Sequence, residues 1–246
     1  MSNPYQFLLF DFVNTLVLPD SSGLPVLIVE GRAIPSTAPL LWEPLVELRP
    51  GLEPAAVHRA QREAWRWAEE QRSLDHREIP ALERFQRLAA ILEILPPGPD
   101  FLPALVERHM AAVADTMRLP DAHKRLLETL RARYRLGILS NFDHGPPVRA
   151  VLRREGVLEW FEPVVVSADI GYRKPGREAF ARALAQARAE PQTVLHIGDS
   201  FQDDVMGALG AGLDVAWINP GGDPAPGGLP PTFELPSLMH LEALLK

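Results

Sequence analysis

Four short polar segments of this chain carry residue types that could act on an anionic group. Asp11 follows the apolar run QFLLF, and Ser140 with Asn141 follows the apolar run LGIL. A lysine–proline pair begins at Lys174, and the acidic segment GDSFQDD begins at Gly198. A carboxylate, a hydroxyl, an ammonium and an acidic cluster are suited to nucleophilic attack on an anion held beside a cation.

Each segment alone also has an ordinary structural interpretation. An Asp can cap a turn, a Ser can end a strand, and a Lys before a proline-started helix can be solvated. The acidic segment is harder to explain, because helix N-capping accounts for only one of its three carboxylates, Asp199, Asp203 and Asp204. Their mutual repulsion would raise their pKa values unless a cation lies nearby, so this segment predicts a metal site.

Strands and helices are expected to alternate around these segments. Strand-like apolar runs occupy residues 6–13, 134–141, 161–169, 193–200 and 214–220, and helical spacing occupies residues 121–133, 146–155, 175–189 and 201–211. This alternation predicts an α/β fold with a doubly wound parallel sheet. Ligands of such sheets bind at the carboxyl ends of the strands. Asp11, Ser140, Asp169 and Asp199 are expected at those ends.

A different pattern interrupts this order after the first strand. Three apolar stripes with helical spacing fall between Ser21 and Asp115, and their members are Val57, Ala60, Ala64 and Trp67, then Leu82, Phe85, Ala89 and Leu92, then Leu102, Leu105, Val106 and Val113. The stripes predict amphipathic helices. We therefore expect a core domain of residues 1–20 and 116–246 and a helical insertion of residues 21–115.

Composition narrows the classes of function. The 246 residues carry a formal net charge of -7, which argues against a nucleic-acid partner because phosphate-backbone binding needs clustered Lys and Arg. The chain has no Cys, so disulfides, zinc–thiolate sites and cysteine nucleophiles are excluded. No apolar run approaches membrane-spanning length, and no basic signal segment is evident. We expect a cytoplasmic protein with no membrane partner, and its oligomeric state is not readable.

The order of the four segments resembles the four motifs of the haloacid dehalogenase superfamily. The match covers residues 5 to 20 and about 116 to 220. The resemblance implies a Rossmann-like core with a helical cap, and a small phosphorylated molecule as substrate. It implies Asp11 as the nucleophile, with Ser140 and Lys174 as the other catalytic residues.

The same resemblance implies a Mg²⁺ cofactor and the residues that surround it. The implied metal residues are Asp11, Val13 through its backbone carbonyl, Asp199 and Asp204. The implied phosphate-binding residues are Asn14, Thr15, Ser140, Asn141 and Lys174. Asp204 would steady Lys174 or a metal-bound water, and Asp203 could compete for that role.

One position departs from the family pattern. Phosphatases of the family carry a second Asp two positions after the nucleophile, where it donates and accepts protons, but this chain has Val13 there. The adjacent Gly is replaced by Asn14, a residue that tolerates the left-handed conformation. Three hypotheses follow: a phosphatase that lacks its usual acid, a binding or regulatory protein without turnover, or a 2-haloacid dehalogenase. His144, just past Ser140, is the histidine best placed to replace the acid.

Two related readings fit less well. A carbon–phosphorus hydrolase of the family needs a Schiff-base lysine in its cap, and the insertion contains no Lys. A dehalogenase needs no Mg²⁺, which would leave the acidic segment without a cation.

Other conspicuous residues have a structural and a functional interpretation. Trp65, Trp67 and Arg62 could line a substrate pocket, although packing is the more frequent role of such residues. His196 within VLHIGD is typical of a buried core histidine, and Asp169 of a turn carboxylate.

Overall fold

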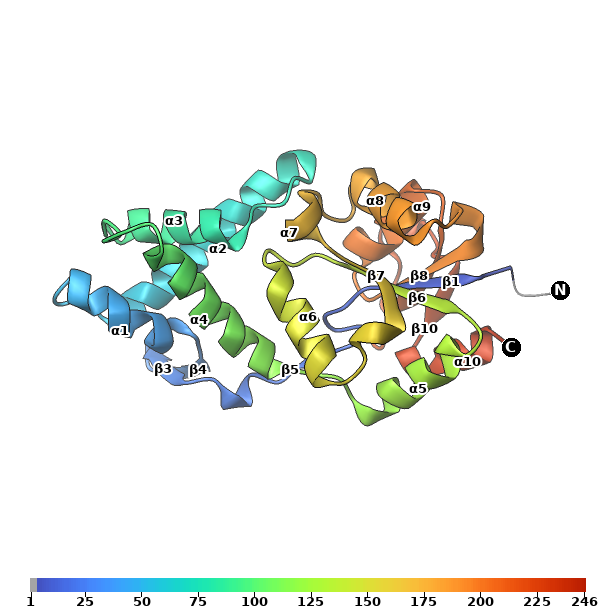
Figure 1. Ribbon diagram of the computed structural model, residues 1–246, viewed down its shortest axis with the longest axis horizontal. Helices are drawn as coiled ribbons and strands as arrows, with labels where there is room; N and C mark the ends of the chain where they lie inside the picture. The colour runs from blue at the N-terminus through green and yellow to red at the C-terminus, as the bar shows by residue number, and fades with distance from the viewer. Residues whose placement is uncertain (1–3) are drawn as a thin grey trace. The chain divides into compact units, whose positions relative to one another are not determined.

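The computed structural model describes residues 4–246, and the chain divides into two compact units (Figure 1). One unit runs to Pro19 and resumes at Arg118, and the other spans Asp20–Met117. Each unit buries apolar side chains of its own, so each has a separate hydrophobic core. Among the described residues, no helix is both long and apolar enough to cross a bilayer.

The first unit is built on a six-stranded sheet with the order β10-β9-β8-β1-β6-β7, and every pairing in it is parallel. The strands are β1 (Phe7–Phe10), β6 (Arg135–Ser140), β7 (Phe161–Val166), β8 (Val194–Gly198), β9 (Asp214–Ile218) and β10 (Phe233–Leu235). This arrangement confirms the predicted α/β fold with a doubly wound parallel sheet. The short β10 was not expected from the sequence.

The two strands that precede Asp11 and Asp199 lie side by side in the middle of the sheet. All residues of β1 and β8 are buried, as expected for strands covered on both faces. Phe10 is in register with Ile138 of β6 and with Ile197 of β8. The carboxyl ends of these three strands are therefore level, which brings the residues that follow them to one edge of the sheet.

Helices cover both faces of this sheet: α8 and α9 lie on one side, and α5 and α10 on the other (Figure 1). The helices of this unit are α5 (Asp121–Arg131), α6 (Gly145–Arg154), α7 (Ser167–Ile170), α8 (Arg177–Ala187), α9 (Gly207–Gly210) and α10 (Leu241–Leu244). Short 3₁₀ turns occur at Leu158–Trp160, Pro191–Thr193, Pro226–Gly228 and Leu238–His240.

Three predicted elements differ in detail. The helix expected from Pro175 begins at Arg177, with Gly176 as its N-cap, so Pro175 does not start it. The helix expected over residues 201–211 is a π-helical segment, η4 (Phe201–Met206), followed by α9. The strand expected to reach residue 169 ends at Val166, because the chain turns into α7.

The second unit contains four helices and a hairpin. The helices are α1 (Ala38–Leu48), α2 (Pro54–Asp75), α3 (Ala81–Ile91) and α4 (Phe101–Thr116), and a 3₁₀ turn, η1 (Ser21–Gly23), precedes them. Helix α1 packs on α2 and α4, and α3 also packs on α2 and α4. The predicted helices over the three apolar stripes are confirmed, although Leu82 is exposed and Trp67 is only half-buried.

The prediction that the insertion is entirely helical was wrong for its first residues. Strands β3 (Val26–Val29) and β4 (Arg32–Pro35) form an antiparallel hairpin. Its turn consists of Glu30 and Gly31, which both have positive φ, the geometry that favours a tight two-residue hairpin. A second short pair, β2 (Leu18–Pro19) with β5 (Met117–Arg118), joins the segments where the chain enters and leaves the insertion.

Helix α1 was missed because a proline interrupts its pattern. Pro44 lies inside the helix and has no N–H, so the carbonyl of Leu40 one turn earlier lacks its usual helical donor. Arg108 of α4 donates to that carbonyl from Nη1 at 2.9 Å. The helix therefore tolerates Pro44 because a neighbouring helix supplies the lost hydrogen bond.

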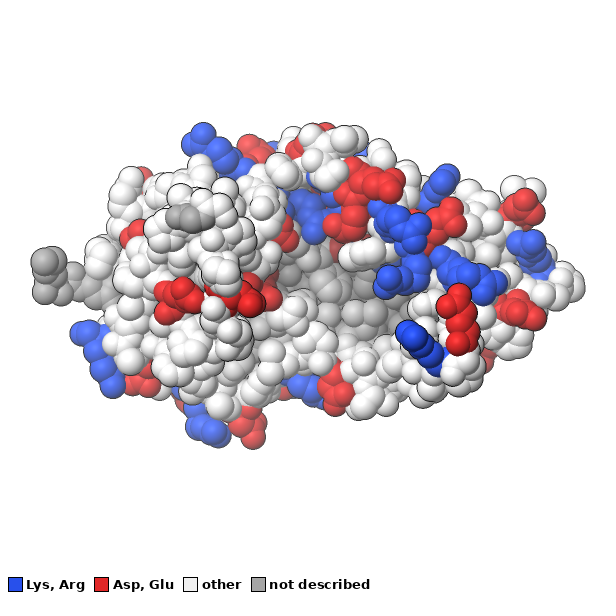
Figure 2. Space-filling model, turned by 180° about the vertical axis from the view of Figure 1, so that it is seen from behind, with Lys and Arg blue, Asp and Glu red and all other residues white. Residues whose placement is uncertain are grey.

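Charged side chains are mixed on the molecular face shown in Figure 2. Lys and Arg alternate with Asp and Glu in small groups over that face.

Two glycines of α9 provide a test of core packing. A Cβ at Gly207 would lie 2.6 Å from the Phe180 ring and 3.0 Å from the backbone of Pro175, whereas a Cβ at Gly210 would meet nothing within 4 Å. We expect Gly207→Ala to lower the free energy of unfolding by about 1–3 kcal/mol through overpacking. Gly210→Ala should raise it by up to about 1 kcal/mol through helix propensity. Denaturant unfolding measures both, and equal effects would contradict the packing described.

Candidate active site

A buried lysine joins two of the acidic residues. Lys174 is 1% exposed, and its Nζ lies 2.6 Å from Oδ1 of Asp11 and 2.6 Å from Oδ1 of Asp204. Asp11 directly follows β1, and Asp204 lies on η4, so the ammonium connects two segments that are distant in sequence. Both ion pairs are shielded from water, where charge–charge interactions are strong.

The environment changes the pKa values of all three groups. Burial raises the pKa of Asp11 to about 7, although Lys174 acts in the opposite direction. Burial alone would lower the pKa of Lys174, but Asp11 and Asp204 hold it above its usual value. Burial alone would raise the pKa of Asp204, but Lys174 and His196 hold it below its usual range. The stable charges at neutral pH are therefore an ammonium at Lys174 and a carboxylate at Asp204.

Asp204 is fixed by more than the lysine. Its Oδ1 also accepts a hydrogen bond from Nε2 of His196 at 2.9 Å, and its Oδ2 accepts from the backbone N–H of Ser200 at 3.0 Å. Burial lowers the pKa of His196, so a neutral imidazole donates this bond. A Cβ on Gly198 would collide with the Asp204 carboxylate, which explains why glycine ends β8.

The side chain of Asn141 holds the backbone of the lysine. Its Oδ1 accepts from the N–H of Lys174 at 2.8 Å, and its Nδ2 donates to the carbonyl of Lys174 at 2.9 Å. The same Nδ2 donates to Oδ2 of Asp203 at 3.2 Å. Asp203 therefore contacts Asn141, while Asp204 contacts Lys174.

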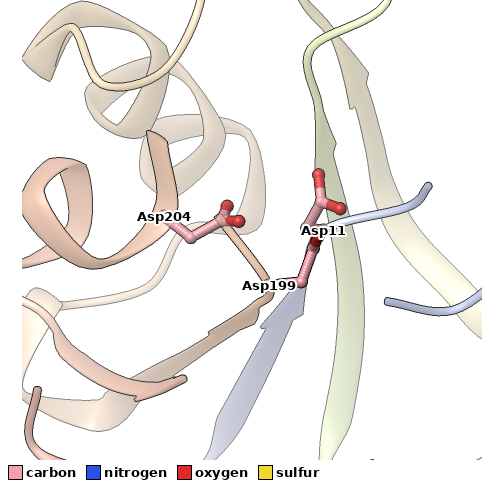
Figure 3. A group of neighbouring side chains, drawn as sticks. All are labelled: Asp11, Asp199 and Asp204. Atoms are coloured by element: carbon pink, nitrogen blue, oxygen red, sulfur yellow. The ribbon is translucent and has the colours of Figure 1, made fainter. Parts of the chain in front are cut away.

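A third carboxylate completes the cluster. Asp199 follows β8, and its Oδ1 accepts a hydrogen bond from the hydroxyl of the buried Thr15 at 3.1 Å. Carboxylate oxygens of Asp11, Asp199 and Asp204 lie within 4.8 Å of one another (Figure 3). Burial and the nearby Asp204 raise the pKa of Asp199.

The charges of this cluster fit a divalent cation. Three carboxyl groups face a single ammonium, so ionisation of all three would leave an excess of negative charge at a site that is largely shielded from water. Hard carboxylate oxygens are ligands that Mg²⁺ prefers. Both oxygens of Asp204 already accept protein hydrogen bonds, so Asp11 and Asp199 are the carboxylates better able to hold a metal.

The turn after Asp11 has the backbone conformation expected of it. Asn14 has a φ of 63°, the left-handed conformation that a Gly adopts easily. The N–H groups of Leu16 and Val17 donate to the carbonyl of Phe12, which closes the turn. Val13 is half-buried, and its side chain has no group that could transfer a proton.

Ser140 ends β6 at the same edge of the sheet. It is 1% exposed, and within residues 4–246 its hydroxyl makes no hydrogen bond to the protein. The hydroxyl is thus available to a bound group. Phe10 and Ile138 are in register, so Ser140 and Asp11 end adjacent strands.

Two further residues were weighed as neighbours of the site. Asp169 lies within α7 and accepts a hydrogen bond from Arg149 at 2.6 Å. His144 occupies the N-cap position of α6 and is half-buried.

The link between His196 and Asp204 was missed in the sequence. His196 was interpreted as a core histidine, and it is indeed fully buried. The available signal was its position two residues before Gly198, because residues i and i+2 of a strand face the same side. That side is the one against which the Asp204 carboxylate packs.

Comparisons with known proteins find a family that matches most of this chain. Residues 5–212 match the model of a hydrolase family, haloacid dehalogenase-like hydrolase. Pyrimidine 5'-nucleotidase YjjG of Escherichia coli (strain K12) is 36% identical over 122 residues, which are 49% of this chain and 53% of that protein. Glyceraldehyde 3-phosphate phosphatase of Pyrococcus abyssi (strain GE5 / Orsay) is 31% identical over 131 residues, 52% of this chain and 53% of that protein. The chain spans about half the length of the curated relatives it matches.

Solved structures share the fold across the whole chain. A 2-haloacid dehalogenase from Pseudomonas syringae pv. Tomato DC3000 has a TM-score of 0.67 at 21% identity, with 98% of each chain covered. The HAD-hydrolase YfnB from Bacillus subtilis, solved with bound magnesium, has a TM-score of 0.62 at 24% identity, with 98% of each chain covered.

The contacts of Asp204 and Asp203 lead to different expectations when each residue is replaced by Asn. Asp204→Asn leaves Lys174 with one charge partner in a buried site, so we expect the free energy of unfolding to fall by about 3 kcal/mol or more. Asp203→Asn keeps the shape of a half-buried side chain and should change stability by less than about 1 kcal/mol. Urea unfolding of the two variants measures the difference. A larger loss in Asp203→Asn would show that the lysine is held by the other carboxylate.

A cation at the cluster should stabilise the folded protein. With Mg²⁺ at a hundredfold excess over its dissociation constant, we expect a gain of about 2.7 kcal/mol, or roughly 5–10 °C in melting temperature. Asp199→Asn should remove most of this shift, and Asp169→Asn, which pairs with Arg149 instead, should retain it. An undiminished shift in Asp199→Asn would place the cation elsewhere.

Proposed function

Because the chain belongs to the haloacid dehalogenase-like hydrolase family, we propose that it is a Mg²⁺-dependent phosphatase that acts on a small phosphorylated metabolite through Asp11. The observation that carries this proposal is the Nζ of Lys174, 2.6 Å from Asp11, beside the carboxylate of Asp199. This arrangement unites a nucleophile with positive charge and hard oxygen ligands. The names of YjjG and of the glyceraldehyde 3-phosphate phosphatase support a phosphate ester as substrate.

In the proposed reaction, an oxygen of Asp11 attacks the phosphorus of the substrate. The new bond to phosphorus forms as the ester oxygen departs, which leaves an aspartyl phosphate on Asp11. Water then attacks this phosphorus, and inorganic phosphate and the free carboxylate are released. When bound, Mg²⁺ supplies positive charge that screens the repulsion between the carboxylate and the phosphoryl group.

The chain's own residues have three further proposed roles. Lys174 offsets the negative charge of the phosphoryl group and orients Asp11. The hydroxyl of Ser140 and the backbone N–H of Asn141 hold phosphoryl oxygens, together with the turn at Asn14 and Thr15. Asp204 fixes the ammonium of Lys174 through the contact described above.

Val13 sets the chemical limits of the reaction. The departing oxygen of an alkyl phosphate needs a proton, and a valine side chain cannot give one. General acid–base catalysis is typically worth about 10²–10⁴-fold in rate. Esters with a good leaving group, such as aryl phosphates, do not need this proton, so we propose that they are hydrolysed faster than alkyl phosphates.

Two other functions remain as alternatives to this proposal. The absence of an acid at Val13 favours a phosphate-binding or regulatory protein that does not turn over. A 2-haloacid dehalogenase, in which Asp11 attacks carbon, would leave the acidic cluster without a cation. We propose that the unit spanning Asp20–Met117 is the cap domain and that the protein works in the cytoplasm.

Val13→Asp tests the proposed catalytic deficit. We expect this variant to raise kcat/KM for alkyl phosphates by up to about 10²–10⁴-fold, because a proton donor is restored. Activity on p-nitrophenyl phosphate should change much less, and Val13→Asn, of the same shape but unable to transfer a proton, should give no gain. Asp11→Asn should abolish every activity. Steady-state assays with and without Mg²⁺ measure these effects.

The same assays separate the alternatives. A binding protein would be supported if phosphate together with Mg²⁺ protects the protein from heat while no ester is hydrolysed. Release of halide from a 2-haloacid without metal would support a dehalogenase. Failure of Asp11→Asn to abolish ester hydrolysis would overturn the proposed mechanism.

A further inference from the structure

A cavity of about 330 Å³ lies entirely within the unit that spans Asp20–Met117. One face of α2 forms much of its wall, with His58, Gln61, Arg62 and Trp65. These positions have the spacing i, i+3, i+4 and i+7, so their side chains lie along one stripe of the helix. The volume is at the lower end of the range for small-molecule sites, about 300–1,000 Å³.

The polar groups of this stripe are oriented by the protein. Nε2 of Gln61 donates to the hydroxyl oxygen of Thr37 at 3.1 Å, so its Oε1 remains as an acceptor. Nδ1 of His58 is paired with the hydroxyl of Ser36 at 3.1 Å. Arg62 makes no ion pair or hydrogen bond within residues 4–246, and its guanidinium remains as a donor. The wall therefore presents one fixed acceptor, on Gln61, and one donor, on Arg62.

Trp65 provides a flat surface in the same cavity. Trp65 is 47% exposed. The guanidinium carbons of Arg72 and Arg84 lie 5.0 Å and 5.3 Å from its ring centroid. Arg72 is itself buried, with Nε 2.8 Å from Glu78 and Nη2 donating to the carbonyl of Ile79. The two guanidinium groups therefore pack over the indole, and Arg84 also lines the cavity, while part of the indole stays open.

The chemistry of the cavity selects among ligands. No Asp or Glu is among its described lining residues, so groups rich in acceptors are favoured. A simple carboxylate would satisfy Arg62 but has no N–H or O–H to donate to the Oε1 of Gln61. A ring whose edge carries both an acceptor and an N–H donor satisfies both residues, and its face can stack on Trp65.

We propose that this cavity binds a nucleobase. The ring stacks on Trp65, an N–H of its edge donates to Oε1 of Gln61, and a ring acceptor receives a hydrogen bond from Arg62. Arginine, glutamine and an aromatic platform are side chains that proteins use to read bases. This binding site lies within one unit, and it does not depend on the proposed phosphatase reaction.

The test uses the full chain with Asp11→Asn, titrated without Mg²⁺ by calorimetry. The probes are uridine, cytidine, adenosine and guanosine, which carry no phosphate, with ribose and benzoate as comparison ligands. We expect at least one nucleoside to bind at a single site and ribose not to bind. Because no phosphate is present, the result stands whether or not the protein is a phosphatase.

Variants of α2 locate the binding. Arg62→Ala and Gln61→Leu should each lower the affinity for the nucleoside about tenfold or more, as expected for loss of one base-edge contact. Arg66→Ala, an exposed arginine one turn along the helix that does not line the cavity, should leave affinity unchanged. Melting temperatures of all variants report that the fold is kept.

Three outcomes would overturn the proposal. The first is no binding of any nucleoside to the Asp11→Asn protein at millimolar concentration. The second is equal weakening by Arg66→Ala and Arg62→Ala, which would place the ligand elsewhere. The third is binding of benzoate alone, lost in Arg62→Ala and kept in Gln61→Leu, which would identify an organic anion site.

Discussion

The ammonium of Lys174, enclosed between Asp11 and Asp204, is the constraint on which the rest of the core depends. A buried charge is costly unless its partners are close and well oriented. The surrounding structure meets this requirement from several directions: Asn141 fixes the backbone of the lysine, His196 fixes Asp204, and β1 delivers Asp11. The parallel sheet matters because it brings these distant segments to one edge.

Much of this site was readable from the sequence, because each segment follows an apolar strand and parallel strands end at a common edge. That logic placed Asp11, Ser140 and Asp199 together. It did not distinguish Asp203 from Asp204. The segment after β8 is π-helical rather than α-helical, and this changes which side chain turns back toward Gly198. Local sequence carries little information about such a change of register.

The insertion was harder to predict, for physical reasons that differ along its length. Its long amphipathic helices have clear periodicity, and they were found. Helix α1 contains Pro44, whose lost hydrogen bond is replaced by Arg108 from a helix far along the chain. The hairpin turn at Glu30 and Gly31 is a two-residue signal, easily overlooked before a long helical region. Long-range compensation and short turns are the features that periodicity does not report.

The pairing of β2 with β5 allows the two units to change independently of each other. The chain leaves the core and returns to it through neighbouring segments, so the sheet is insensitive to what is connected between them. A longer insertion adds little to the entropic cost of loop closure, about 0.6 kcal/mol for each doubling of its length. One inserted domain can therefore be exchanged for another during evolution while the carboxylates and the lysine stay in place. Selectivity and reactivity can diverge independently in such an architecture.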